Sequence, residues 1–285
     1  MKDRKVLKKV YVINLLFIIG FLICLYPIVS SFIGGYYQRS AIATYKDSIN
    51  KIESSALTED LVKAEEYNNT LYNYNNILGN KTNLSILQEY KNILNIGDGI
   101  MGSIEIPKIS VNLPIYHGTS EEVLTQGVGH VEGSSLPIGG TNTRSLLSAH
   151  TGLPTSKLFT SLDELVVGDL FFIRIQNETL AYKVRDIKII DPEDIESLKI
   201  EDGKDLVSLI TCTPYGLNTH RLIVTGERVA YEVEEYSNIE KKAMSTREMA
   251  FTILPFMFLG VVVVLKLKDK NSVNKFKQQS GNIYN

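Results

Sequence analysis

Residues 209–224 of the chain read LITCTPYGLNTHRLIV, two short apolar runs joined by a polar segment that contains Pro-Tyr-Gly. The pattern predicts a β-strand that ends near Cys212, a turn, and a second strand that begins near Arg221. A thiol and a guanidinium would then lie side by side at one end of a sheet. Because a permanent cation next to a lone thiol favours the thiolate, we predict that Cys212 is a nucleophile.

Two other stretches are almost wholly apolar. Residues 10–33 are long enough to cross a bilayer, and residues 248–266 reach about the minimum spanning length. Basic residues precede the first stretch and follow the second, which is typical of a chain whose two ends stay in the cytoplasm. We therefore predict two transmembrane helices, cytoplasmic tails over residues 1–9 and 267–285, and an extracellular part between the spans.

Each predicted span has an alternative. The first could be a cleaved signal peptide, although the apolar core of such a peptide is shorter, about 7–15 residues. The second could be a buried hairpin with similar hydropathy. An uncleaved anchor and a second span are the preferred interpretation, which makes the chain a two-span protein of the cell membrane.

Cysteine and charge counts restrict the chemistry. The chain has two cysteines, Cys24 inside the first predicted span and Cys212 outside it, so the extracellular part cannot form an internal disulfide. The formal net charge of −2 gives no reason to expect a nucleic acid partner. The histidines and cysteines do not follow a metal-site spacing such as C-x-x-C or H-E-x-x-H, so neither a metal nor a cofactor is expected.

The part between the predicted spans changes character near Gly102. Residues 34–98 carry apolar side chains at helical spacing, which predicts two or three helices that form a stalk or pack against the next domain, with a loop over residues 73–83. Residues 99–230 contain short β-type runs separated by turns and predict a closed barrel, followed by a linker over residues 231–247. The β-type runs are 103–106, 111–115, 146–149, 170–175, 181–190, 206–210 and 222–224, and short helices are predicted at 120–126 and 156–162.

A cysteine nucleophile needs a group that moves protons, and histidine is the usual choice. Of the four histidines, His150 ends an apolar run and begins a turn, a position that exposes its side chain at the rim of a barrel. The other three are interpreted as structural. His117 and His130 lie in predicted turns near glycines, and strand alternation points His220 away from the face of Arg221.

The segment TCTPYGLNTHR, residues 211–221, resembles the active-site strand and loop of the sortases, the cell-wall transpeptidases of Gram-positive bacteria. Its Pro-Tyr and Asn-Thr-His-Arg elements are most similar to the class C, pilus-assembling branch. Three further stretches match that branch in order: IEIPKI at 104–109, GHVEGSSLP at 129–137 and SAHTGLP at 148–154. The resemblance implies a mainly β fold, a sortase-like closed barrel of about eight strands with short helices, preceded by an N-terminal helical region.

The resemblance also implies a role for each site residue. Cys212 would attack the threonine carbonyl of an LPxTG-like sorting signal. His150 would protonate the leaving glycine amine and later accept a proton from the incoming amine. Arg221 would position the substrate and stabilise the oxyanion, with Thr211 as a supporting hydroxyl and the backbone N–H of Thr213 as a second donor. The partners would be pilin or surface proteins with such signals, and the acceptor a pilin lysine amine.

One feature of class C sortases is missing from the sequence. These enzymes usually carry a lid with an Asp-Pro-aromatic anchor, but residues 28–106 contain no proline. Residues 73–97 and the adjoining Asp98 form a possible lid, with Tyr74, Tyr90 or Asp98 over the cysteine. Whether such a lid closes the site is left open.

Three alternative functions remain. Two are enzymes that transfer the acyl group to a different acceptor, and the third is a protein without catalytic activity. A housekeeping sortase would attach surface proteins to a lipid-linked peptidoglycan precursor. A papain-like peptidase would use water, but it orders cysteine before histidine, whereas here His150 precedes Cys212. A non-catalytic membrane-anchored scaffold that binds pilins would need neither a cation nor a histidine beside an exposed thiol.

Overall fold

The structure is a computed structural model that describes residues 2–76, 88–153, 156–194, 196–239 and 246–281. The chain divides into two compact units, one formed by residues 30–243 and the other by residues 1–29 together with 244–285. The unit of residues 30–243 contains the β-strands of the described chain and all of the predicted site residues.

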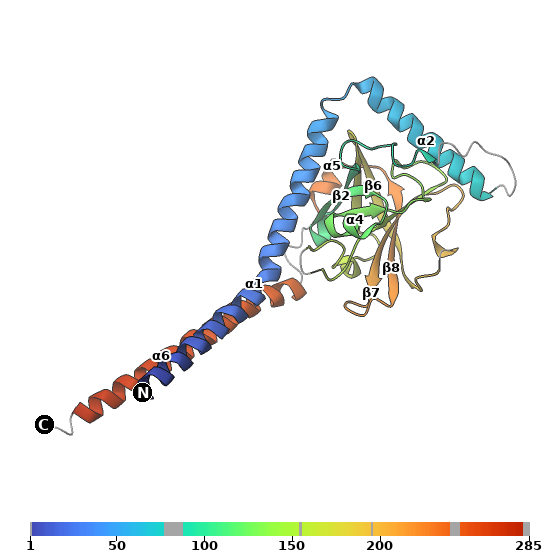
Figure 1. Ribbon diagram of the computed structural model, residues 1–285. Helices are drawn as coiled ribbons and strands as arrows, with labels where there is room; N and C mark the ends of the chain where they lie inside the picture. Colours follow the sequence, from blue (N-terminus) through green and yellow to red (C-terminus); the bar gives the residue numbers. More distant parts are fainter. Residues whose placement is uncertain (1, 77–87, 154–155, 195, 240–245, 282–285) are drawn as a thin grey trace. The chain divides into compact units, whose positions relative to one another are not determined.

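A closed β-barrel forms the centre of the unit of residues 30–243 (Figure 1). In the described residues, its eight strands follow one another in the order β1-β2-β3-β4-β7-β8-β6-β5. The pairs β2–β3 and β4–β7 run parallel, and the other paired strands are antiparallel. The predicted mainly β barrel of about eight strands is therefore confirmed. The strands are β1 (Ile100–Ile106), β2 (Val111–His117), β3 (Val128–His130), β4 (Thr143–Ser148), β5 (Leu170–Ile175), β6 (Glu178–Ile190), β7 (Asp205–Thr213) and β8 (His220–Val229).

Strand β3 is the one strand that the sequence did not predict. Its three residues include Gly129, and with Gly127 just before it the segment has the composition of a turn. The structure pairs it with β2, with His117 opposite His130. A Cβ atom at position 129 would collide with the carbonyl oxygen of Gly118, so glycine at this position permits the close approach of β3 to the end of β2.

The two predicted short helices have different outcomes. Helix α4 (Glu121–Gln126) forms as predicted, and its N-cap Ser120 accepts a hydrogen bond from the N–H of Val123 at 3.4 Å. The helix predicted at 156–162 is wrong: this segment is a turn that leads into η2. Its apolar side chains are buried one after another in the core, so tertiary contacts override the helical pattern. The remaining short elements are η1 (Pro107–Ile109), η2 (Leu162–Glu164), η3 (Glu196–Leu198) and α5 (Val233–Ser237).

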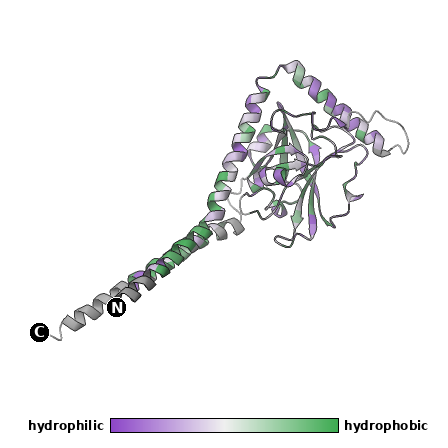
Figure 2. Cartoon of the chain, in the orientation of Figure 1, coloured by the Kyte–Doolittle hydropathy of each residue, from purple (hydrophilic) through white to green (hydrophobic). Residues whose placement is uncertain are grey.

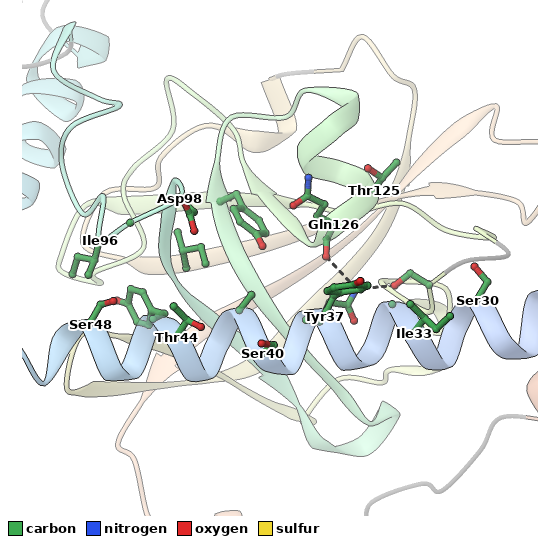
Figure 3. Close-up of a pocket in the computed structure, with 18 residues that line it drawn as sticks. Ser30, Ile33, Tyr37, Ser40, Thr44, Ser48, Ile96, Asp98, Thr125 and Gln126 are labelled. Atoms are coloured by element: carbon green, nitrogen blue, oxygen red, sulfur yellow. Dashed lines mark hydrogen bonds between the residues drawn. The ribbon is translucent and has the colours of Figure 1, made fainter.

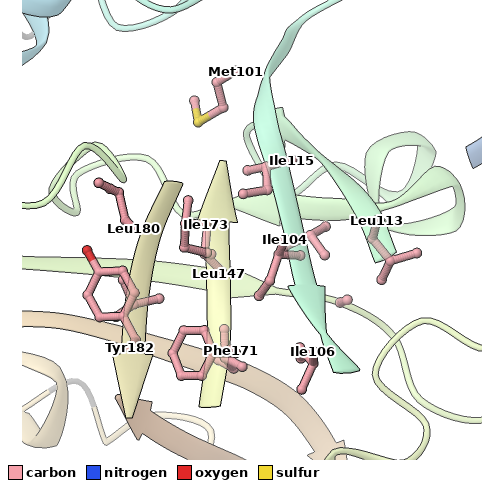
Figure 4. Close-up of a cluster of buried hydrophobic side chains, with 14 of the residues drawn as sticks. Met101, Ile104, Ile106, Leu113, Ile115, Leu147, Phe171, Ile173, Leu180 and Tyr182 are labelled. Carbon is pink, nitrogen blue, oxygen red and sulfur yellow. The ribbon is translucent and has the colours of Figure 1, made fainter. Parts of the chain in front are cut away.

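Strand β5 shows how the core explains a continuous apolar run. Phe171, Ile173 and Ile175 belong to the main buried cluster, whereas Leu170 and Phe172 belong to a separate cluster on the other face of the strand. Because both faces are covered, the strand has no polar face to alternate with. Burial of each such side chain contributes roughly 1.5–3 kcal/mol. Figure 4 shows interior side chains that include Met101, Ile104, Ile115, Leu147 and Phe171.

Helices α1 (Lys2–Ile49) and α2 (Ser54–Asn76) contribute residues that are bound to the barrel. The hydroxyl of Tyr45 donates to the carbonyl of Met101 at 2.9 Å and accepts from the N–H of Gln176 at 2.9 Å. Burial raises the pKa of Tyr45 to about 12, so its hydroxyl stays protonated and available as a donor. The end of α1 is therefore attached to the start of β1 and to the turn between β5 and β6.

A second attachment comes from Asn68 on α2. Its amide nitrogen donates to the carbonyl of Leu136 at 3.1 Å, and its amide oxygen accepts from the N–H of Leu136 at 2.7 Å. Asn68 is buried. Of the two predicted alternatives, a stalk or helices packed against the next domain, the structure shows the packed helices. Residues 73–76 of the predicted loop belong to α2, and residues 77–83 lie outside the described residues.

The other unit is described as two helical segments, whose exposed side chains over residues 11–29 and 253–264 are mainly apolar. It contains the part of α1 up to residue 29 and helix α6 (Thr246–Gly281), and the rings of Phe17 and Phe258 lie 5.4 Å apart. Figure 2 shows the apolar stretch of α1 in green. Within the described residues, one helical stretch is long and apolar enough to cross a membrane, Tyr11–Ile49, with a mean hydropathy of 2.6 in its most apolar window.

Candidate active site

Cys212 and Arg221 face each other across the β7–β8 hairpin. They are direct partners in the antiparallel register, so their side chains leave the same face of the sheet, with Cβ atoms about 4.5–5.5 Å apart. Cys212 is a free, partly exposed thiol. Arg221 Nη1 donates to the carbonyls of His220 at 3.2 Å and Asn218 at 3.3 Å. The guanidinium is thus oriented by the backbone of its own turn.

His150 reaches the same end of the barrel from strand β4. This strand runs parallel to β7 with Ser148 opposite Ile210, and the N–H of Ala149 donates to the carbonyl of Ile210 at 3.1 Å. His150 and Cys212 each follow these partners by two positions. In an extended chain a step of two returns to the same face, so the imidazole and the thiol point to one side of the sheet.

Thr211 holds β4 and β7 together directly beneath the site. Its buried hydroxyl donates to the carbonyl of Ala149 at 2.8 Å, one residue before His150. Thr213 pairs with His220 in the register, and alternation directs both threonine side chains to the face opposite Cys212. The Thr211 side chain therefore binds the backbone just before His150. Thr213 follows Cys212 directly, so its backbone N–H, and not its side chain, is the group near the thiol.

The loops after β4 and β7 touch at Gly152 and Tyr215. Gly152 has a φ of +75°, and a Cβ atom there would lie 3.2 Å from the ring of Tyr215. Its N–H donates to the hydroxyl of Thr160 at 3.1 Å. A glycine is required both for the backbone conformation and for the aromatic ring above it. The sequence reasoning missed this contact, because it joins two turns from separate parts of the chain.

Glu121 is a second residue that the sequence reasoning missed. Its Oε1 atom lies 3.3 Å from Nε2 of His150, without the alignment of a hydrogen bond. Nε2 is itself buried and has no hydrogen-bond partner among the described residues. The sequence predicts a short helix over residues 120–126, and no local pattern indicates that this helix faces His150.

Two of the other histidines contact the segment that leads into the barrel. His130 is fully buried, with Nδ1 2.9 Å from the hydroxyl of Tyr90 and Nε2 2.8 Å from the carbonyl of Ser135. Burial lowers the pKa of His130 to about 4, so the ring is neutral at physiological pH. His117 lies 2.8 Å from the carbonyl of Ile93. These contacts agree with a structural role for both residues.

His220 is the third histidine predicted to be structural. It lies opposite Thr213, is half exposed, and contacts the hydroxyl of Thr219 at 2.9 Å and Oδ1 of Asp191 at 3.5 Å. Its side chain leaves the face of the sheet opposite that of Arg221, as strand alternation predicted.

Of the three residues predicted to cover the cysteine, Tyr90 and Asp98 have other surroundings. Tyr90 is buried, and burial raises the pKa of its hydroxyl, which bonds His130. Asp98 lines a groove beside α1, and Tyr74 is exposed. Residues 77–87 lie outside the described residues, so a lid formed by them stays a prediction.

The groove beside α1 has a volume of about 760 Å³ (Figure 3). The amide nitrogen of Gln38 joins its walls by donating to the carbonyl of Gln126 at 3.1 Å and to the hydroxyl of Ser156 at 2.7 Å. Cys212, His150 and Arg221 are not among its lining residues, so its position does not connect it with the predicted reaction. Among the described residues, no group of three or more His, Cys, Asp or Glu side chains is arranged to hold a metal ion.

Comparisons with known proteins point to one family. A family profile described as a sortase domain matches residues 104–229. Sortase C1 from Streptococcus agalactiae is 45% identical in the aligned part, which covers 68% of this chain and 100% of that chain with a TM-score of 0.63. A sortase C from Clostridium perfringens, solved with a C-terminal cell wall sorting motif, is 45% identical over 67% of this chain and 99% of that chain, with a TM-score of 0.59.

A curated relative adds a more distant similarity. Sortase A from Streptococcus agalactiae is 28% identical over 181 residues, which is 62% of this chain and 71% of that protein. The two solved structures are therefore more similar to this chain than the curated relative is.

Proposed function

The chain belongs to the sortase family of cysteine transpeptidases, and from this premise we propose that it joins proteins with an LPxTG-like sorting signal to a lysine amine of a pilin. Cleavage would occur between the threonine and glycine of the signal. The product would be an isopeptide bond between two protein chains, and repetition of the reaction would polymerise a pilus. No cofactor takes part in this scheme.

The register of β7 and β8 is the observation that carries the proposal. It sets Cys212 directly opposite Arg221, on the face that His150 shares from the end of β4. In our scheme the sulfur of Cys212 attacks the threonine carbonyl carbon. The Arg221 guanidinium and the backbone N–H of Thr213 donate to the oxyanion that develops on the carbonyl oxygen.

Proton transfer in the scheme belongs to His150. When the bond between threonine and glycine breaks, His150 gives a proton to the leaving amine, and a thioacyl group remains on Cys212. The incoming amine then attacks this group, the bond to sulfur breaks, and His150 takes a proton from the amine. Thr211 supports these steps through its hydrogen bond to the carbonyl of Ala149, which fixes the backbone before His150.

The choice of a pilin lysine as acceptor rests on the class C branch. The solved structures of 45% identity are class C sortases, and the sequence carries the Pro-Tyr and Asn-Thr-His-Arg elements of that branch. A housekeeping sortase, with a lipid-linked peptidoglycan precursor as acceptor, is the main alternative. The two functions differ only in which amine is used.

We also propose that the protein spans the cell membrane twice. Residues 10–33 and 248–266 would form the spans, residues 99–230 the extracellular catalytic domain, and residues 34–98 and 231–247 its connections to the membrane. Basic residues outside both apolar stretches support cytoplasmic tails over 1–9 and 267–285. A reporter fused at either end should be inaccessible from outside intact cells. Surface labelling of either reporter would contradict this topology.

The catalytic proposal is tested with the full chain in detergent micelles and an LPxTG-type peptide. Mass spectrometry should detect a thioacyl adduct on Cys212 and release of the peptide that begins with glycine. Cys212→Ala should form no adduct, while Cys24→Ala, the matched change at the other cysteine, should retain it. Full turnover by Cys212→Ala would overturn the mechanism.

The acceptor is tested by competition. The thioacyl enzyme is supplied with a pilin that bears a lysine and with a peptidoglycan-precursor amine in equal amounts. Preferential formation of the isopeptide product is expected. Preference for the precursor would favour the housekeeping function, and release of acid alone in the presence of both amines would favour a peptidase.

A further inference from the structure

Glu121 places a carboxylate beside the imidazole of His150. The Oε1 atom lies 3.3 Å from Nε2, and Nε2 is shielded from solvent while lacking an aligned hydrogen-bond partner in the described part of the chain. The side chain of Glu121 is 79% exposed, whereas that of His150 is 25% exposed. Glu121 therefore presents a solvent-accessible carboxylate in contact with a ring nitrogen that solvent does not reach.

We propose that Glu121 binds the ammonium group of the incoming lysine, an inference that rests on the proposed transpeptidase function. A lysine amine has an unperturbed pKa of about 10.4 and arrives protonated at neutral pH, so it must lose a proton before it can attack. An exposed carboxylate attracts this ammonium, and the neighbouring Nε2 is the group that takes the proton. The group that would bind the ammonium and the group that would take its proton thus lie 3.3 Å apart.

The proton balance of the step is closed. The lysine ammonium gives one proton to neutral His150 and attacks the thioacyl carbon as a free amine. The new C–N bond forms, the C–S bond breaks, and Cys212 leaves as a thiolate beside protonated His150. The second proton lost as the amide forms passes to solvent. The amine released in the first half-reaction takes up one proton from solvent, so the complete exchange consumes none.

A purely structural role for Glu121 predicts a different outcome. Acidic residues are common in the first turn of a helix, where they interact with the positive end of the helix dipole, and Glu122 shares this position. Glu121 differs from Glu122 in its contact with His150. A helix-start role would be shared by both residues, whereas an ammonium site should involve Glu121 alone.

The test uses the full chain in detergent micelles with an LPxTG-type peptide as acyl donor. The two acceptors are a lysine-bearing peptide, which is cationic, and hydroxylamine, which is uncharged at neutral pH. Glu121→Gln should raise the KM for the lysine peptide by up to about fivefold, the range of a solvent-exposed charge pair. It should change the KM for hydroxylamine much less. Glu122→Gln, the matched control, should alter neither value.

Two results would overturn the inference. Equal losses with lysine peptide and hydroxylamine would mean that Glu121 acts on His150 itself, and an unchanged KM for the lysine peptide would mean that it does not meet the acceptor. Failure of the transpeptidase proposal is separate, because it would appear as the lack of a Cys212 thioacyl adduct in the unsubstituted protein. Raising the salt concentration should reduce the difference between the protein and its Glu121→Gln variant, since exposed charges are screened.

Discussion

At the scale of single residues, the candidate site is assembled from three strand ends and one helix start. Cys212 and Arg221 are paired by the hairpin register, His150 arrives on the neighbouring parallel strand, and Glu121 comes from α4. Hydrogen bonds to backbone carbonyls orient the chain around them, at Arg221 directly and at His150 through Thr211. Substitutions that keep charge or shape but remove these bonds should therefore lower the reaction rate more than they lower the stability of the fold.

Arg221→Lys keeps the positive charge and removes the planar guanidinium, whose Nη1 atom donates to two backbone carbonyls. We expect thioacyl formation to slow by roughly 100-fold, which is the effect of losing one oxyanion donor. Rapid-quench mass spectrometry measures this rate. The control Arg185→Lys changes an arginine that pairs with Glu201 and Glu227 and should retain the rate. A rate for Arg221→Lys within twofold of the original would reduce Arg221 to a surface charge.

Thr211→Val keeps the shape of the side chain and removes the hydrogen bond to Ala149. Because that bond fixes the backbone before His150, we expect kcat to fall severalfold with KM little changed, at a stability cost of about 1 kcal/mol. The matched change Thr225→Val breaks a buried contact of 3.1 Å with Ser208 and should cost similar stability while retaining kcat. Equal kcat for the two variants would contradict a positioning role for Thr211.

The site residues that could be identified from local sequence have reactive or charged side chains at the ends of predicted strands. Cys212 and Arg221 could be predicted as neighbours because one hairpin joins them. Glu121 and the Gly152–Tyr215 contact could not, since each depends on where a separate loop or helix docks, and surface glutamates and glycines are common in turns. Long-range docking is decided by packing of the whole barrel and leaves no signal at the docking residue itself.

At the scale of secondary structure, the elements predicted correctly are those whose apolar pattern matches their burial in the structure. Strands with alternating or doubly buried runs were found, whereas the three-residue β3 was too short to show a period. The predicted helix at 156–162 failed because its apolar residues are drawn into the core separately. Helix α2 is attached to the barrel by a paired hydrogen bond, so its contribution to stability can be measured.

Asn68→Ala should destabilise the catalytic unit by about 2–4 kcal/mol, because it leaves the buried N–H and carbonyl of Leu136 without their partner. Asn69→Ala is the control, since Asn69 is the exposed neighbour on the same helix. Urea unfolding followed by circular dichroism compares the two. A loss below 0.5 kcal/mol for Asn68→Ala, the lower bound for one hydrogen bond, would show that α2 is not held by this contact.

At the scale of the whole molecule, stability should depend on pH through buried His130. Its folded pKa is about 4 and its unfolded value about 6.5, because burial disfavours the charged ring. Above pH 6.5 the ring is neutral in both states and its contribution is fully present. As the pH falls from 6.5 to 4, the unfolded chain takes up a proton that the folded chain refuses, and up to about 3 kcal/mol of stability is lost.

Urea unfolding of the full chain at a series of pH values between 7 and 4 measures this dependence. His220→Asn, which alters an exposed histidine, should keep the slope of the unfolding free energy against pH. His130→Gln should flatten it. An unchanged slope in His130→Gln would assign the acid sensitivity to other groups.

The parallel pairing of β4 with β7 has a consequence for the newly made chain. The thiol and the imidazole come from segments far apart in sequence and meet only when these two strands lie side by side, a contact that forms slowly because a long intervening loop must close first. Until then Cys212 has Arg221 opposite it in the β7–β8 hairpin but lacks the imidazole of His150. We therefore expect Cys212 to become acylated by a sorting signal only once the barrel is complete, so that an unfinished chain does not capture substrates that it is unable to release.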